Sequence, residues 1–408
     1  MVSQTQSTTS EHAGAIVATP VEHEIVVPQG KRLLYIDNLR ILLICGVLVQ
    51  HLSVTYGALG SWDYRDPGNN LLTGIILSIP NGIGMAFGMG FFFLIAGYFT
   101  PGAYDHKGPR AFLQDRLLRL GLPLVLYDLL IHPLVAYIGS GLHGSYWSFY
   151  SSFLLQMRGV TGVVWFLAVL LIFSLFYAGW RILTRHRVTT SKKLGTLPDS
   201  LTIALFIFTL GLVTFVVRIW WPMGWVFQPI SGLSVGYLPQ YISFFILGVI
   251  AYRCDWFTAL TPRMAKRWSL IALLATFLIF GVMTVPMLQA TGVAGTHQSG
   301  YPMAGGFNWL AFSYALWESF MVVGVCIGLL VLFRQRLNHQ GRLARNMAAV
   351  VYIVYLIHAP IMVGFAYALH VLALYPLLKW AIAVLITIPL CFLIALLIRK
   401  IPYVSRVL

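Results

Sequence analysis

The sequence predicts an all-α integral membrane protein with about ten transmembrane helices and both termini in the cytoplasm. Of the 408 residues, 59% are hydrophobic and only 10% are charged, and the mean hydropathy is +0.81. Soluble domains carry about 25% charged residues, so the composition excludes a soluble enzyme or one held by a single anchor. Two further observations, the recurrence of apolar runs and the placement of lysine and arginine between them, support the same fold class.

Apolar runs recur along the chain, each near the roughly 20 residues that a helix needs to cross a bilayer. The first 30 residues differ, because they are polar, contain three Glu and no Lys or Arg, and lack a cleavable signal pattern. We therefore expect a disordered cytoplasmic tail at 1–30 and a polytopic membrane domain at 31–408. The predicted spans are 33–56, 74–99, 117–138, 162–182, 200–220, 234–252, 268–288, 308–332, 346–370 and 375–398.

Lysine and arginine are distributed very unequally between the two sides of this ten-helix arrangement. One side receives 22 of the 27, and Arg40 lies inside the first helix. Because cytoplasmic loops are enriched in Lys and Arg, this asymmetry predicts cytoplasmic termini. The formal charge of +15 then reflects topology, and nucleic acid is not an expected partner. The opposite side receives only Arg65, Arg158, Arg218 and Lys379.

The four cysteines are expected to be small core residues. They lie in or beside apolar runs and lack the spacing of a disulfide framework or a metal site. No bound metal is therefore expected. These residues are Cys45, Cys254, Cys326 and Cys391.

The second predicted span contains closely spaced glycines in the stretch NGIGMAFGMGFFFLIAGYF, residues 81–99. Gly84 and Gly88 form a GxxxG pair, flanked by Gly82 and Gly90. Such spacing lets a neighbouring helix approach closely, which is the more common use of the pattern. The alternative is that the missing side chains leave a groove for a ligand.

The first predicted span, unusually, carries three ionisable residues, Asp37, Arg40 and His51. Arg40 and His51 are 11 residues apart, which is three turns plus about 20°, so they share a helix face about 16 Å apart. Asp37 lies one turn before Arg40 on nearly the same stripe. Charged residues inside a membrane are costly and mark function. The alternative is that Arg40 reaches the headgroups and His51 is merely interfacial.

Polar residues in later spans extend the set of candidates. Glu318 and His358 are expected at similar depths, about 15 and 18 Å into their helices from opposite sides. A pair between them could serve as a structural lock or as a proton relay; we take Glu318 as a catalytic candidate and His358 as structural support. Asp128 and His132, at i and i+4, share a face and could satisfy each other.

Two arginines, Arg116 and Arg119, lie one turn apart in the stretch RLLR at the predicted cytoplasmic side. Guanidinium groups bind phosphate well, so the pair suits a phosphorylated ligand. The alternative is that they only anchor the helix at the inner surface.

The motifs together resemble the membrane acyltransferase-3 family, which includes glucan biosynthesis protein C and the O-antigen and macrolide O-acyltransferases. The resemblance covers nearly all of residues 32–402. Two departures are Ala96, where the family often has Ser, and Gly90, where many members have Asp; glucan-type members also lack that Asp. The matching stretches are RLLYIDNLRILLICGVLVQH (32–51, with the Arg-x10-His motif), FFFLIAGYFTP (91–101), RLLR (116–119), VWFLAVLLIFSL (164–175), YLPQYISFFILGVIAY (237–252) and VYIVYLIHAPIMV (351–363).

This resemblance implies a membrane O-acyltransferase that moves an acyl group from cytosolic acyl-CoA to a carbohydrate hydroxyl at the periplasmic face. Acetyl-CoA or succinyl-CoA would be the co-substrate, a glycan the acceptor, and no cofactor would be bound permanently. A glucan-type member would lie in the bacterial inner membrane. His51 would be the general base or an acyl carrier. Arg116 and Arg119 would bind the CoA phosphates.

Other residues receive supporting roles under the same resemblance. Arg40 would attract the phosphates or the thioester end of the donor, and Asp37 would hold Arg40 in place. Asp128 and His358 would support the site structurally, and Trp165 would line the acceptor surface.

Two functions outside this class fit some of the same residues. A proton-coupled secondary transporter would use intramembrane Glu and His residues. It would also be expected to have paired broken helices in its two halves, which the sequence lacks. A scaffold or lipid-binding protein would leave the alignment of Arg40 and His51 without a purpose.

Overall fold

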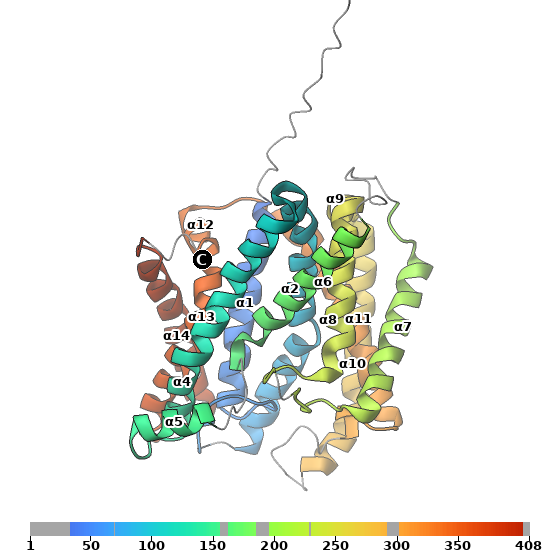
Figure 1. Cartoon of the computed structure of the whole chain (residues 1–408). Helices are drawn as coiled ribbons and strands as arrows, with labels where there is room; N and C mark the ends of the chain where they lie inside the picture. Colours follow the sequence, from blue (N-terminus) through green and yellow to red (C-terminus); the bar gives the residue numbers. More distant parts are fainter. Residues whose placement is uncertain are drawn as a thin grey trace, which may run out of the picture. The chain divides into compact units, whose positions relative to one another are not determined.

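The computed structural model describes residues 33–68, 70–155, 162–184, 196–227, 230–291 and 302–402, with side chains described up to 282 in the fifth range. The described residues from Leu34 onward form one compact unit (Figure 1). Apart from an isolated bridge between Val226 and Ser234, the regular structure in these ranges is helical. This confirms the all-α membrane class; the expected tail, 1–30, lies outside the described residues. The longer helices are α1 (Leu34–Thr55), α2 (Leu71–Arg116), α6 (Trp165–Leu183), α7 (Ser200–Trp220), α8 (Leu238–Cys254), α10 (Pro262–Thr291), α11 (Trp309–Arg336), α13 (Val351–Leu369) and α14 (Pro376–Ile398).

Within the described ranges, nine helical stretches are long and apolar enough to cross a membrane. The stretch Leu71–Gly139 is 69 residues long and comprises α2, two π-helical turns, η1 (Leu117–Gly121) and η2 (Tyr127–Ile131), and the short helices α3 (Leu122–Leu126) and α4 (His132–Gly139). It reverses direction at Gly108, whose φ of 74° and ψ of 167° are non-helical. It therefore crosses twice, and ten crossings result. The interval between the predicted spans 74–99 and 117–138 is also helical, except at Gly108.

Successive crossings run between the same two ends of the unit (Figure 1), and the sequence makes one of these ends rich in cations. We call the end at which α1 begins the basic end and the other the opposite end. Short helices α9 (Trp256–Ala259) and α12 (Arg342–Ala348) lie at the basic end, whereas α5 (Tyr146–Leu155) lies at the opposite end. The described cations at the basic end are Lys107, Arg110, Arg116, Arg119, Arg181, Arg253, Arg263, Lys266, Arg267, Arg334, Arg336, Arg342, Arg345, Arg399 and Lys400.

At the opposite end, the described cations predicted for that side are largely withdrawn from solvent. Arg218 is in the last turn of α7 and Lys379 in the first turn of α14, and both are buried. Arg65 donates to the carbonyl oxygens of Ala58 and Gly60, at 3.2 and 2.5 Å. Arg158 lies outside the described residues. The two ends therefore differ in exposed positive charge even more than the count of Lys and Arg on each side suggests.

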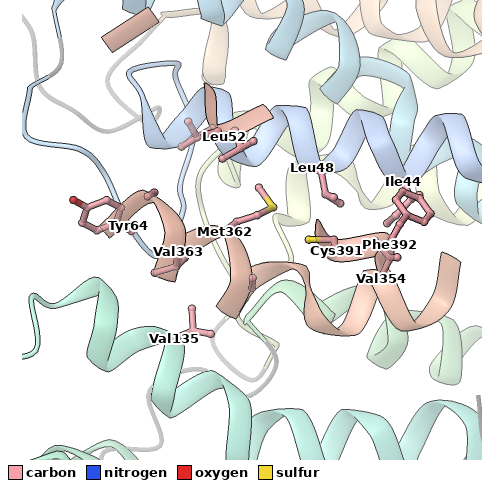
Figure 2. Close-up of a cluster of buried hydrophobic side chains, with 14 of the residues drawn as sticks. Ile44, Leu48, Leu52, Tyr64, Val135, Val354, Met362, Val363, Cys391 and Phe392 are labelled. Atoms are coloured by element: carbon pink, nitrogen blue, oxygen red, sulfur yellow. The ribbon is translucent and has the colours of Figure 1, made fainter. Parts of the chain in front are cut away.

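The core beside the candidate site is built by α1, α13 and α14 (Figure 2). Leu48 and Leu52 of α1 are fully buried, as every third or fourth residue on one face of a packed helix should be. They pack in one cluster with Met362 of α13 and with Cys391 and Phe392 of α14. All four cysteines are free thiols, and Cys391 is in this core.

Glycines set the closest helix contact, between α2 and α8. A Cβ on Gly97 would overlap the backbone carbonyl oxygen of Phe245, and one on Gly248 would overlap that of Leu94. Within the glycine-rich stretch, Gly84 packs against Gln50, whereas a Cβ on Gly88 would meet nothing within 4 Å. Close helix packing therefore explains Gly84 and Gly97 but leaves open space at Gly88.

We expect Gly248→Ala to lower the thermal stability of the protein in detergent markedly, because the added methyl must push two backbones apart. Overpacking costs typically about 1–3 kcal/mol. Gly88→Ala is the matched control, since its methyl enters open space. Equal melting temperatures of the two variants, measured by fluorescence-detected size-exclusion chromatography after heating, would contradict this packing.

Candidate functional site

His51 lies in the last two turns of α1, near the opposite end, and its imidazole belongs to a compact group of three nearly parallel rings. Trp62, from the loop after α1, stacks on it with centroids 3.9 Å apart and planes 19° apart. His358, from the middle of α13, lies 5.4 Å from His51 and 6.1 Å from Trp62, again with nearly parallel rings. Residues that are far apart in the sequence thus form one compact group.

The protonation of His358 follows from its hydrogen bond. Its Nδ1 lies 2.6 Å from the carbonyl oxygen of Tyr355, one turn earlier in α13. Because a carbonyl only accepts, the neutral imidazole carries its proton on Nδ1 and presents a lone pair on Nε2. That Nε2 is buried and has no hydrogen-bond partner among the described residues. It is therefore able to accept a proton or a hydrogen bond from a ligand in the stack.

Tyr355 connects this group to the start of α6. Its ring lies 6.0 Å from that of His358, and its hydroxyl donates to the carbonyl oxygen of Val163 at 2.9 Å. Val163 belongs to the 3-10 turn η3 (Gly162–Val164) that precedes α6. Gly162 has a φ of 39° and lies against His132, leaving no room for a Cβ. The turn therefore brings α4, α6 and α13 together behind the histidines.

Asp63, next to Trp62 in the loop, is an acidic residue whose pKa is changed by its surroundings. Burial of its carboxyl raises its pKa to about 6. Its carbonyl oxygen is in contact with Gly139, at the end of α4, so closely that a Cβ there would overlap it. Near neutral pH the group is thus a weak base close to the stacked rings.

A continuous row of aromatic rings leads from the histidines to the other polar group in the interior. Tyr355 contacts Phe166, at 6.2 Å, and Phe166 contacts Phe93, at 4.7 Å. Phe93 in turn contacts Tyr241, at 5.0 Å. Trp165, expected to line an acceptor surface, stacks on Tyr241 at 5.4 Å and is half-buried in this row.

Glu318, at the far end of the row, forms an ion pair with Arg218 rather than with His358. The Oε2 and Nη1 atoms are 2.5 Å apart, and the side chains are 3% and 0% exposed. Arg218 also donates from Nε to the carbonyl of Gly236, at 3.1 Å, and lies over the ring of Tyr237. The expected Glu318–His358 pair is therefore wrong, because a buried guanidinium on α7 provides a stronger partner.

The predicted phosphate-binding residues are at the basic end. Arg116 ends α2, and its guanidinium lies 5.0 Å from the ring of Phe112. Arg119 is in the π-helical turn η1, is 51% exposed and pairs with Asp115 at 3.1 Å. Turns of π-helix are frequent at functional sites. Arg40 is exposed on α1 and Asp37 is half-buried one turn before it.

The remaining predicted pair, Asp128 and His132, lies on the stretch between these ends. Asp128 Oδ1 and His132 Nδ1 are 3.9 Å apart, close enough for an ion pair but too far for a hydrogen bond. The structure thus brings His51 and His358 together, and separates both from Arg116 and Arg119 at the basic end.

Several residues of the site were missed by sequence reasoning, namely Trp62, Asp63, Tyr355 and Arg218. Trp62 and Asp63 follow the first span in a short polar stretch, SWDYRD, that has no periodic pattern. A tryptophan and three charged residues in such a short loop were the available signal.

Comparison with known protein families identifies a family that covers nearly the whole chain. The model of a family described as an acyltransferase domain matches residues 33–396. The chain matches none of the curated proteins or solved structures with which it was compared. The matched region contains every crossing and both groups of polar residues described above. The chain belongs to this acyltransferase family, the membrane acyltransferase-3 family that its motifs resemble, and it is a multi-pass membrane transferase that acylates a substrate.

Proposed function

We propose that the protein transfers an acetyl or succinyl group from cytosolic acyl-CoA to a hydroxyl of a carbohydrate at the outer face of a bacterial inner membrane. The observation that carries this proposal is the stack of His51 and His358 near the opposite end of α1, the helix that carries Arg40 near the basic end. This arrangement supports a base for the acceptor at one end of the unit and a surface for the CoA phosphates at the other. The lack of an aspartate at Gly90 favours an acceptor of the glucan type.

The charge asymmetry supports the direction of transfer. Lys and Arg concentrate on the cytoplasmic side of membrane proteins, so the basic end is the cytosolic one. Acyl-CoA is an anionic cytosolic metabolite, and Arg116 and Arg119 lie on the side from which it arrives. His51 lies toward the outer side, where a carbohydrate acceptor would be exposed.

The reaction requires a base, and His51 is suited to it. Its imidazole takes the proton from the acceptor hydroxyl as the oxygen attacks the thioester carbonyl. A C–O bond forms, the C–S bond breaks, and the imidazolium returns the proton to the CoA thiolate. In a covalent variant the imidazole itself attacks first and carries the acyl group to the acceptor. His358, whose Nε2 has no hydrogen-bond partner among the described residues, lies next to the imidazolium.

At the basic end, Arg116 and Arg119 bind the CoA phosphates, and Arg40 attracts the phosphates or the thioester arm. Asp37 holds the Arg40 side chain. Glu318, paired with Arg218, stabilises the helix packing. Trp165, which belongs to the row of aromatic rings, lines the surface that binds the acceptor.

We expect Arg116→Ala combined with Arg119→Ala to weaken the binding of CoA at least about tenfold, since each phosphate contact is a charge-assisted hydrogen bond. Free CoA is the probe, because its phosphates are common to all acyl donors, and calorimetry in detergent gives the Kd. The matched control is Arg342→Ala with Arg345→Ala on α12, which has the same spacing at the same end. Unchanged affinity in the first variant would remove the phosphate role.

The function itself is tested with purified protein in liposomes, supplied with radiolabelled acetyl-CoA or succinyl-CoA and a panel of glucan and other oligosaccharides. Label recovered on an oligosaccharide supports O-acyl transfer, and label that remains on the protein indicates the covalent variant. A transporter would move solute or protons without transferring label. Absence of label on every acceptor and on the protein would contradict the proposal.

A further inference from the structure

The loop between α1 and α2 is fixed in place by contacts on four sides. The amide of Leu59 donates to the Ser78 hydroxyl at 2.9 Å, and Asn81 donates to the carbonyl of Leu59 at 2.8 Å, which ties the loop to α2. The ring of Tyr64 contacts Tyr367 of α13 edge-on, and Asp63 lies against α4 as described. The loop is therefore a rigid element.

Its strongest attachment is a buried ion pair with α14. Lys379 Nζ and Asp66 Oδ2 are 3.0 Å apart, and the side chains are 5% and 0% exposed. The other Asp66 oxygen accepts from the amide of Gly68, at 2.8 Å, and the Asp66 amide donates to the carbonyl of Thr55, at 2.9 Å. Each charge is thus compensated by its partner, and both carboxylate oxygens of Asp66 accept hydrogen bonds. A buried ion pair with all its hydrogen bonds made holds the position of the loop on α14.

Trp62 belongs to this rigid loop, but its indole nitrogen makes no hydrogen bond to the described residues. The indole Nε1–H is buried and has no hydrogen-bond partner among the described residues. Buried donors nearly always have partners, so an exception in a functional site requires an explanation. The ring is stacked directly on His51 and is close to His358, whose Nε2 is also unpartnered within the described ranges. A donor and an acceptor that lack partners among the described residues therefore lie beside the imidazole proposed as the base.

We propose that Trp62 is a further catalytic residue, whose indole N–H donates a hydrogen bond to the thioester carbonyl oxygen as it becomes an oxyanion. This inference rests on the proposed function. When the acceptor oxygen attacks, the carbonyl electron pair moves onto its oxygen, and it returns when the C–S bond breaks. The indole stabilises the intermediate charge without transferring its proton. A donor held by a rigid loop requires no reorganisation during the reaction, which is the condition under which such groups contribute most.

The decisive variant is Trp62→Phe, which retains an aromatic ring to stack on His51 but removes the N–H. We expect kcat for transfer to fall roughly 100-fold, the range for loss of one oxyanion donor, while KM for acyl-CoA and the melting temperature change little. Trp147→Phe, at an exposed tryptophan of α5, is the matched control. A kcat of Trp62→Phe equal to that of the control would overturn the proposal.

A second measurement does not depend on turnover. The indole N–H signal of Trp62 is identified in the NMR spectrum by its absence from Trp62→Phe. We expect it to shift when a non-hydrolysable ketone analogue of acetyl-CoA or succinyl-CoA is added, and not when free CoA is added. A shift without transfer to any acceptor would support the carbonyl contact while contradicting the acyl-transfer reaction. No shift with an analogue that binds would contradict the contact itself.

Discussion

Replacing His51 by alanine is expected to abolish acyl transfer while the protein still inserts and folds. Loss of a general base lowers turnover about 10²–10⁴-fold, and loss of an acyl carrier would remove turnover altogether. Transfer of radiolabel in liposomes measures the effect, and size-exclusion chromatography shows whether the variant is folded.

The control for this experiment is His143→Ala, because His143 is an exposed histidine after α4, also at the opposite end. It should transfer label at the wild-type rate. Normal transfer by a folded His51→Ala variant would exclude both the base and the carrier role, whatever His358 does.

Replacing Glu318 by alanine is expected to destabilise the protein by about 3–5 kcal/mol, because it leaves the fully buried Arg218 without compensation. The double variant Glu318→Leu with Arg218→Met removes both charges and should recover most of that loss. Thermal unfolding of the purified variants gives the comparison.

The control is Asp115→Ala, which breaks partly exposed pairs with Lys107 and Arg119 and should change stability by no more than about 1 kcal/mol. If Glu318→Ala melts like the wild type but loses transfer, Glu318 acts in catalysis as the sequence suggested. If it melts early and the double variant is active, its role is structural.

Features that depend on local periodicity could be predicted from the sequence. The ten crossings and the two-ended distribution of charge belong to this group, because bilayer thickness dictates the length of each apolar run. The connection between the second and third crossings is predicted less well. The stretch PGAYDHKGPR, 101–110, is typical of a loop because it contains two prolines, two glycines and four charged or histidine side chains, but helix continues through it except at Gly108.

Contacts between distant segments could not be predicted in the same way. The spacing of Glu318 and His358 gives their depths, but depth alone does not decide which helices are neighbours. Arg218, near the end of the predicted span 200–220, counts among the exposed cations of the opposite side when only the sequence is read, whereas packing of α7 against α11 buries it. Trp62 belongs to a loop whose conformation depends on Lys379, a residue of the last crossing, so no local pattern indicates that it reaches His51.

The reversal at Gly108 has a consequence for biosynthesis. Helix continues on both sides of it through the charged stretch at the basic end, which contains Lys107 and Arg110. The two crossings of Leu71–Gly139 therefore start from one short helical turn, and we expect them to enter the membrane together as a helical hairpin.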